Sequence, residues 1–175
     1  MTYERFEDVP VWQAAAALYD ATEDLLENES FHASRGFRDQ LDRAALSVSN
    51  NIAEGFERGT TNELLAFLYI ARGSAGEVRS MLTVMLRRAG KACWPSGLQS
   101  QISSLKSLAE SCSRQLRGWA DSLQNSDIKG QRHLNGKSRL ADGQKKRAAA
   151  FEKELLRKLP AWHPKRKEAE EQGLI

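Results

Sequence analysis

Residues 40–55, with the sequence QLDRAALSVSNNIAEG, constrain the fold of this chain more than any other stretch. At the helical period of about 3.6 residues, apolar side chains recur along one side, namely Leu41, Ala45, Val48, Ile52 and Phe56. Polar side chains recur at similar spacing along a second side, namely Gln40, Arg43, Ser47, Asn51 and Glu54. The pattern predicts a helix that faces a hydrophobic core on one side and a hydrogen-bonding partner on the other. That partner is a neighbouring helix, a second subunit or a ligand.

Helical periodicity extends over the first 124 residues. Apolar residues recur at intervals of three and four over residues 10–28, 34–57, 61–90 and 98–124. Thr60 and Glu63 have the spacing of a capping box, so the turn between the second and third helices is short. Short turns without strand-like alternation predict an all-α fold, an antiparallel up-down-up-down four-helix bundle over residues 1–124. The apolar seam expected on the fourth helix consists of Leu98, Ile102, Leu105, Leu108, Cys112, Leu116, Trp119 and Leu123.

The third predicted helix has two unusual parts. Its residues 64–71, LLAFLYIA, are apolar on every side, which predicts that another subunit covers them. Gly73 and Gly76 follow, and each costs about 1 kcal/mol of helix propensity relative to alanine. We expect a close approach to the small residues of the second helix to offset that cost. The expected polar contacts there form a structural network that fixes helix register and subunit packing, made of Gln40, Arg43, Ser47, Asn51, Glu54, Ser74 and Glu77.

Charge divides the chain at the end of the predicted bundle. Residues 1–125 carry 13 Lys and Arg against 16 Asp and Glu, a balance of −3, whereas residues 126–175 carry 13 against 7, a balance of +6. The composition of residues 125–143 predicts a linker. Residues 144–175 are expected to form a short basic amphipathic helix, over about residues 142–159, and a disordered end. Its apolar side consists of Ala148, Phe151, Leu155, Leu159 and Trp162.

No catalytic pattern emerges from the sequence. Glu54 and Glu77 could be imagined as a metal-binding or acid/base pair, but the three histidines all lie outside the two helices that hold these acids. Cys93 and Cys112 belong to no CxxC motif. We therefore expect no enzyme, no cofactor and no metal site. The longest apolar run has eight residues and the N-terminus is charged, so we expect a cytoplasmic protein without a membrane span.

Several segments of the bundle resemble one known family. They are Phe6, residues 11–13 (VWQ), residues 40–45 (QLDRAA) with Ser47, residues 51–55 (NIAEG), Phe67, and residues 71–74 (ARGS) with Glu77. In this order and spacing, over roughly residues 3–124, the chain resembles the four-helix bundle proteins encoded in intervening sequences of bacterial large-subunit ribosomal RNA genes. That family includes the accessory variability determinant of diversity-generating retroelements. The resemblance implies a homo-oligomer, a ring-shaped pentamer. For the retroelement branch it implies binding of RNA or DNA and of a reverse transcriptase, without catalysis.

Two groups of basic residues are candidates for nucleic-acid binding. The first lies toward the C-terminal end of the third helix, where the helix dipole also favours cations: Arg79, Arg87, Arg88 and Lys91. The second lies in the tail: Lys145, Lys146, Arg147, Lys153, Arg157 and Lys158. The alternative is a protein interaction scaffold without nucleic-acid contact, in which the apolar side of the tail helix docks in a groove. Membrane-surface binding by this helix is less favoured, because its apolar side is short.

Overall fold

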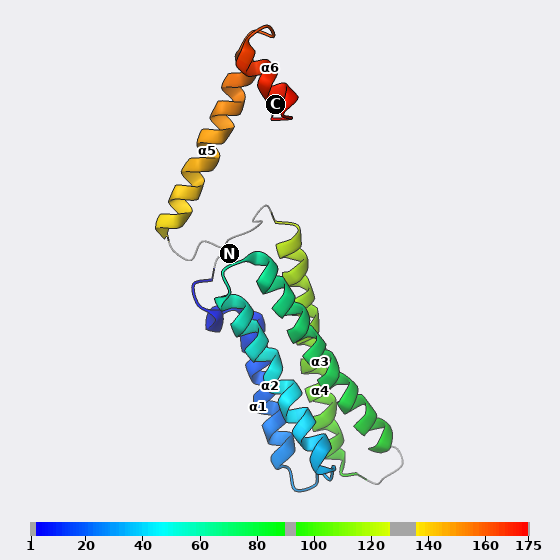
Figure 1. The fold of residues 1–175 in the computed structure, drawn as a ribbon. Coiled ribbons are helices and arrows are strands. Elements are labelled where there is room, and N and C mark those ends of the chain that lie inside the picture. The colour runs from blue at the N-terminus through cyan, green and yellow to red at the C-terminus, as the bar shows by residue number, and fades with distance from the viewer. Residues whose placement is uncertain (1–2, 90–93, 127–135, 175) are drawn as a thin grey trace. The chain divides into compact units, whose positions relative to one another are not determined.

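The computed structural model describes the backbone of residues 3–89, 94–126 and 136–174. The chain forms two compact units, residues 1–132 and residues 133–175. The first unit contains a short 3-10 helix, Phe6–Asp8, and four long helices: α1 Pro10–Glu27, α2 Arg35–Glu57, α3 Thr61–Ala89 and α4 Ser96–Gln124 (Figure 1). Every described element is helical, and none of the described helices is long and apolar enough to cross a membrane.

The four long helices form the predicted antiparallel up-down-up-down bundle. α1 packs on α2 and α4, and α3 packs on α2 and α4, so each helix has two neighbours around one core (Figure 1). All four helices supply fully buried side chains, among them Leu18, Leu41, Leu68 and Leu105. Ser34 caps α2 by accepting a hydrogen bond from the Phe37 amide. Thr60 caps α3 in the same way through the Glu63 amide, at 3.2 Å, as the capping-box spacing predicts.

The core side of α3 follows a repeat of alternating three and four residues. Its buried members are Leu64, Leu68, Ala71, Ala75, Val78, Leu82 and Met85. This spacing of about 3.5 residues is the coiled-coil repeat, in which the positions beside the core face the neighbouring helices. Ser74, just before a core position, bonds to Ser47 of α2. Positions just after a core position therefore lie on the opposite flank, toward α4.

The same repeat corrects the predicted seam of α4. Ala109 and Ala120 are buried in the core, whereas Leu108, Trp119 and Leu123 are only partly buried. At Leu108 and Trp119 the prediction was wrong because it selected the larger of two adjacent apolar residues. In each case the alanine of α4 packs in the core of the bundle, and the larger neighbouring side chain covers the flank of the helix.

Close approach between α2 and α3 occurs at a different glycine from those predicted. A Cβ atom built on Gly55 would lie 2.6 Å from Cβ of Phe67 and 3.3 Å from Cδ1 of Leu64. At Gly73 and Gly76 no atom lies within 4 Å of such a position apart from neighbouring residues and backbone of α3 itself. The prediction that these two glycines admit α2 is therefore wrong. They lie on the outer sides of α3, away from the core repeat.

The second unit contains α5, Gly136–Lys158, and α6, Pro164–Glu171. The predicted linker is wrong for residues 136–143, which are helical, and the predicted disordered end is wrong for residues 164–171. Pro164 begins α6 at a first-turn position, where a missing N–H removes no helical hydrogen bond. Gly173, at φ 67°, lets the amide of Leu174 return to the carbonyl of Ala169 at 2.8 Å and so ends the helix.

Candidate nucleic-acid interface

The predicted polar network forms two hydrogen-bonded groups between α2 and α3. In the first, Arg43 donates to Oε1 of Gln40 at 2.7 Å, and Nε2 of Gln40 donates to the Glu77 carboxylate. In the second, Ser47 and Ser74 hydroxyls lie 3.0 Å apart, and Nδ2 of Asn51 donates to the Ser47 carbonyl at 2.7 Å. Both groups join α2 to α3.

Glu54 does not belong to that network. Its carboxylate pairs at 2.6 Å with Arg58, the residue that directly follows the end of α2. The Arg58 guanidinium also lies 5.2 Å from the ring centre of Phe67 and 3.9 Å from the Glu63 carboxylate. These contacts hold the α2–α3 turn together. Both Arg43, within the network, and Glu54, outside it, are exposed on the protomer.

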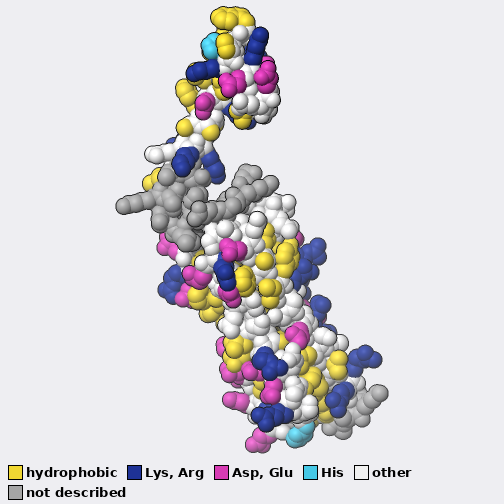
Figure 2. All heavy atoms as spheres, in the orientation of Figure 1, with side chains coloured by type: hydrophobic (Ala, Val, Ile, Leu, Met, Phe, Trp, Pro, Cys, Tyr) yellow, Lys and Arg dark blue, Asp and Glu magenta, His cyan; other side chains and the backbone are white. Residues whose placement is uncertain are grey.

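The predicted cations of the bundle are accessible. Arg79, Arg87 and Arg88 are exposed, and none of the three forms an ion pair with another described residue. Lys91 lies outside the described residues. Figure 2 shows Lys and Arg side chains projecting along the edge of the bundle that α3 and α4 form. Three unpaired guanidinium groups on one helix favour an external anion as their partner.

The predicted tail cations are all exposed on α5, namely Lys145, Lys146, Arg147, Lys153, Arg157 and Lys158. Lys158 is paired with Glu154 at 2.7 Å, within its own helix. The apolar side of the same unit is also accessible: Phe151 is 67% exposed and Trp162 is 73% exposed. The second unit therefore presents both a basic surface and an apolar surface.

The bundle itself is divided by charge between its two helix pairs. Residues 1–58, which contain α1 and α2, carry 5 Lys and Arg against 12 Asp and Glu, a balance of −7. Residues 59–125, which contain α3 and α4, carry 8 against 4, a balance of +4. On the acidic side, burial together with the charges of Asp42 and Glu23 raises the pKa of Tyr19 to about 12. The overall balance of −3 conceals this division, which appears only when the charges are sorted by helix.

Four cations of α3 and α4 were missed by the sequence analysis. They are Arg72, Lys106, Arg114 and Arg117. No other Lys or Arg directly adjoins any of them in the sequence, so no run of charge marks them. Only the packing of α3 against α4 places them on the same side of the bundle.

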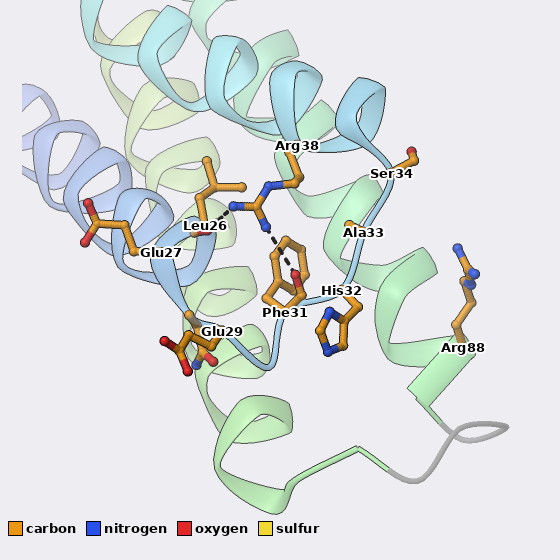
Figure 3. A pocket seen from close by; sticks show the side chains of 10 residues that line it. Leu26, Glu27, Glu29, Phe31, His32, Ala33, Ser34, Arg38 and Arg88 are labelled. Carbon is orange, nitrogen blue, oxygen red and sulfur yellow. Dashed lines mark hydrogen bonds between the residues drawn. The ribbon is translucent and has the colours of Figure 1, made fainter.

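A hollow of about 580 Å³ lies where the α1–α2 loop meets the end of α3 (Figure 3). Arg38 is one of the residues that line this hollow. Its guanidinium group already donates hydrogen bonds to the carbonyls of Leu26 and Phe31, the latter at 3.1 Å. It also lies 5.8 Å from the Phe31 ring centre. In Figure 3 the Arg88 side chain stands apart from this group. Arg38 therefore holds the loop against the end of α1, and its charge is not free for a ligand.

Cys112 is buried in the core, and burial raises the pKa of its thiol to about 11. A thiol with this pKa remains protonated at neutral pH and is a poor nucleophile. Within the described parts of the chain, no three His, Cys, Asp or Glu side chains are grouped so that they could hold a metal ion.

Residues 7–118 match the family described as 23S rRNA-intervening sequence protein. The chain belongs to this family. No curated protein matches its sequence. The family match includes α1 to α3 and most of α4, and with them the polar network, Gly55 and the arginines of α3 and α4. The tail cations lie outside the family match, so they are a feature of this chain beyond the shared region.

Proposed function

We propose that this protein is a non-catalytic, oligomeric member of its family that binds the phosphate backbone of RNA or DNA. The observation that carries the proposal is the division of charge, −7 over residues 1–58 and +4 over residues 59–125. A polyanion is attracted to the α3 and α4 side and repelled by the α1 and α2 side, so the bundle presents one orientation to it. The basic tail adds a second attachment.

Contacts of this kind give affinity without reading bases. Arg79, Arg87 and Arg88 are exposed, so they bind phosphate groups without the large desolvation cost of buried charges. Each neutralised phosphate releases condensed counterions, which makes binding steeply dependent on salt. Repeating the cluster around a homo-oligomer multiplies the contacts and so increases the affinity.

Exposed apolar side chains on α3 support the proposal that the protein forms a homo-oligomer. Tyr69 is 45% exposed, Ile70 is 50% exposed and Val84 is 48% exposed. These side chains lie outside the core repeat of the protomer, and a second copy covering them removes apolar surface from water. The resemblance to ring-forming bundle proteins makes a pentamer the assembly that we propose. Native mass spectrometry at several protein concentrations tests it.

The resemblance to the retroelement branch supports a further proposal. The protein acts in the cytoplasm, and its protein partner is a reverse transcriptase. A reverse-transcriptase gene beside this gene, and copurification of its product with the full chain, would support that branch. A gene position inside a ribosomal RNA operon without such an enzyme would count against it.

Binding is tested with the full chain and two fluorescent probes, an RNA duplex and a DNA single strand of the same length. Anisotropy titrations from low to moderate salt are expected to give a negative slope of log affinity against log salt. The slope divided by about 0.9 for the duplex gives the number of phosphate contacts. Absence of binding by both probes at low salt would overturn the proposal.

A second candidate function, a protein interaction scaffold, is favoured by the apolar side of the second unit. Phe151, Leu155 and Trp162 are at least half exposed, although such side chains are usually covered in a folded unit. Scaffold function predicts that Phe151→Gln with Leu155→Gln abolishes partner binding and leaves nucleic-acid affinity unchanged. A nucleic-acid affinity that falls as much as the partner affinity would count against a separate scaffold role.

A further inference from the structure

The second unit has almost no core of its own. Among its residues whose side chains the structure describes, only Ala169 is buried. Its large apolar side chains, Phe151, Leu155 and Trp162, are each at least half exposed. Rings of this size are usually covered in a folded protein, because leaving them in water costs free energy. Their exposure therefore indicates that an external ligand covers this surface.

The turn that carries Trp162 is held by hydrogen bonds. α6 folds back beside the C-terminal end of α5 (Figure 1). From α6, the Arg166 guanidinium donates a hydrogen bond to the Leu159 carbonyl at 2.8 Å. The His163 amide donates to the Pro160 carbonyl at 2.9 Å and closes a turn that contains Trp162. The indole ring is therefore presented to solvent from a hydrogen-bonded turn.

Cations accompany the rings on α5. This helix carries 8 Lys and Arg against 3 Asp and Glu, a balance of +5. Arg147 precedes Phe151 by four residues and Lys158 follows it by seven, so the three side chains lie along one side of the helix. Lys158 is paired with Glu154 at 2.7 Å, whereas Arg147 forms no ion pair with another described residue. Phe151 thus has a cationic side chain before it and another after it.

This combination of exposed rings and cations fits one kind of polyanion. Cations attract a phosphate backbone, and aromatic rings stack on the faces of unpaired bases. Bases inside a duplex are already stacked on their neighbours, so they offer no face to a ring at the protein surface. A single strand satisfies both kinds of side chain at once, whereas a duplex satisfies only the cations.

We propose that the second unit binds single-stranded nucleic acid. Phe151 and Trp162 stack on unpaired bases, and Arg147 and Lys158 contact neighbouring phosphates; we name these four residues the α5 stacking site. The assignment rests on the proposed function and gives the tail a preference for single strands that the bundle arginines do not supply. Because every base has a face on which a ring can stack, the site has little sequence preference. It is an alternative to the scaffold function of the same surface.

An aromatic variant of the full chain, Phe151→Ala with Trp162→Ala, tests the stacking. Three fluorescent probes are compared by anisotropy at one salt concentration: oligouridylate, an abasic single strand of equal length and an RNA duplex. The variant should bind oligouridylate at least about tenfold more weakly, because each stacked base contributes about 5- to 150-fold. Its affinity for the other two probes should change by less than about twofold, since neither offers an unpaired base. Both side chains are mostly exposed, so their removal leaves the fold intact, which circular dichroism checks.

Two matched controls separate stacking from apolar contact and from charge. Leu140→Ala with Leu155→Ala removes exposed aliphatic side chains from the same helix and should leave oligouridylate affinity within about twofold of wild type, because neither leucine has a ring. Arg147→Gln with Lys158→Gln should weaken oligouridylate and the abasic strand alike and reduce their salt slopes by about 1 to 2. Oligothymidylate, titrated in parallel, distinguishes DNA from RNA as the strand.

Four results would overturn the α5 stacking site. The first is unchanged oligouridylate affinity in the aromatic variant, which leaves the proposed function standing if the wild type binds the probes. The second is the same result together with lost flotation on phosphatidylserine vesicles, which assigns the surface to a membrane. The third is equal weakening of oligouridylate and the abasic strand by the aromatic variant, or equal weakening of oligouridylate by the aromatic and leucine variants. The fourth is a wild type that binds none of the probes, which overturns the proposed function as well.

Discussion

Replacing Gly55 by alanine places a methyl group at the contact between α2 and α3. The new Cβ would lie 2.6 Å from Cβ of Phe67, whereas carbon atoms pack best at about 3.5–4.0 Å. The obstructing atom is attached directly to the α3 backbone, so a side-chain rotation does not remove the overlap. α3 has to withdraw by about 1 Å, and this opens the core at Leu64, which is 1% exposed in the native protein.

The expected loss follows from two opposing terms. Overpacking of a filled core costs about 1–3 kcal/mol, and a backbone obstruction belongs at the upper end of that range. Helix propensity offsets part of this cost, because alanine stabilises a helix by about 1 kcal/mol relative to glycine. We therefore expect Gly55→Ala to lower the free energy of unfolding by about 2 kcal/mol, and the melting temperature by roughly 5–10 °C.

Urea unfolding followed by far-ultraviolet circular dichroism measures this loss, with Gly73→Ala as the control. Gly73 has open space around it, so alanine there is expected to raise stability by about 0.5–1 kcal/mol. A Gly55→Ala protein as stable as the wild type would refute the close approach of α2 and α3. A loss of stability for Gly73→Ala would instead reveal that another copy contacts this side of α3.

Three further predictions concern single residues. Arg38→Ala should lower the free energy of unfolding by about 1–3 kcal/mol, because the Leu26 and Phe31 carbonyls lose their donor; urea unfolding checks it, and an unchanged midpoint would contradict the assigned role. Arg43→Ala should change the free energy of unfolding by less than about 0.5 kcal/mol, because Arg43 is exposed on the protomer. Calorimetry and native mass spectrometry together check this prediction. A larger loss accompanied by dissociation would place Arg43 in a subunit interface. Burial raises the Cys112 pKa from 9.0 to about 11, so the folded state holds the thiol proton more tightly. The resulting stabilisation is complete below pH 9 and is lost between pH 9 and about pH 11. Over this range the urea midpoint should therefore fall less with rising pH in Cys112→Ala than in the wild type. Parallel plots of urea midpoint against pH for the two proteins would contradict this prediction.

Local periodicity predicts most of the bundle. The apolar side of residues 40–55 is buried as expected, and Ser34, Thr60 and Glu63 mark helix starts through hydrogen bonds that involve near neighbours in sequence. The choice between Ala109 and Leu108 was wrong because it depends on the facing helices. The same is true of the glycines: Gly55 and Gly76 look alike in sequence, and only the position of α3 makes one obligatory and leaves the other open.

The candidate site was harder to predict because its charges are dispersed. Arg79 was included as part of a cluster near the end of its helix, while Arg72 and Arg117 are isolated residues 45 positions apart in sequence. Their relation depends on the packing of α3 against α4. The tail differs for another reason: a disordered end was predicted, whereas Pro164 begins α6 at a first-turn position, where a missing N–H removes no helical hydrogen bond.

The most direct measurement is photochemical crosslinking of the full chain to RNA that contains 4-thiouridine, followed by peptide mapping. Crosslinks are expected in peptides from α3 and α4, and in α5. Peptides of α1, which carries four acids and neither Lys nor Arg, should remain free of RNA. Crosslinks concentrated on α1, or an even distribution over all four helices, would contradict a bundle whose two charged sides have different roles.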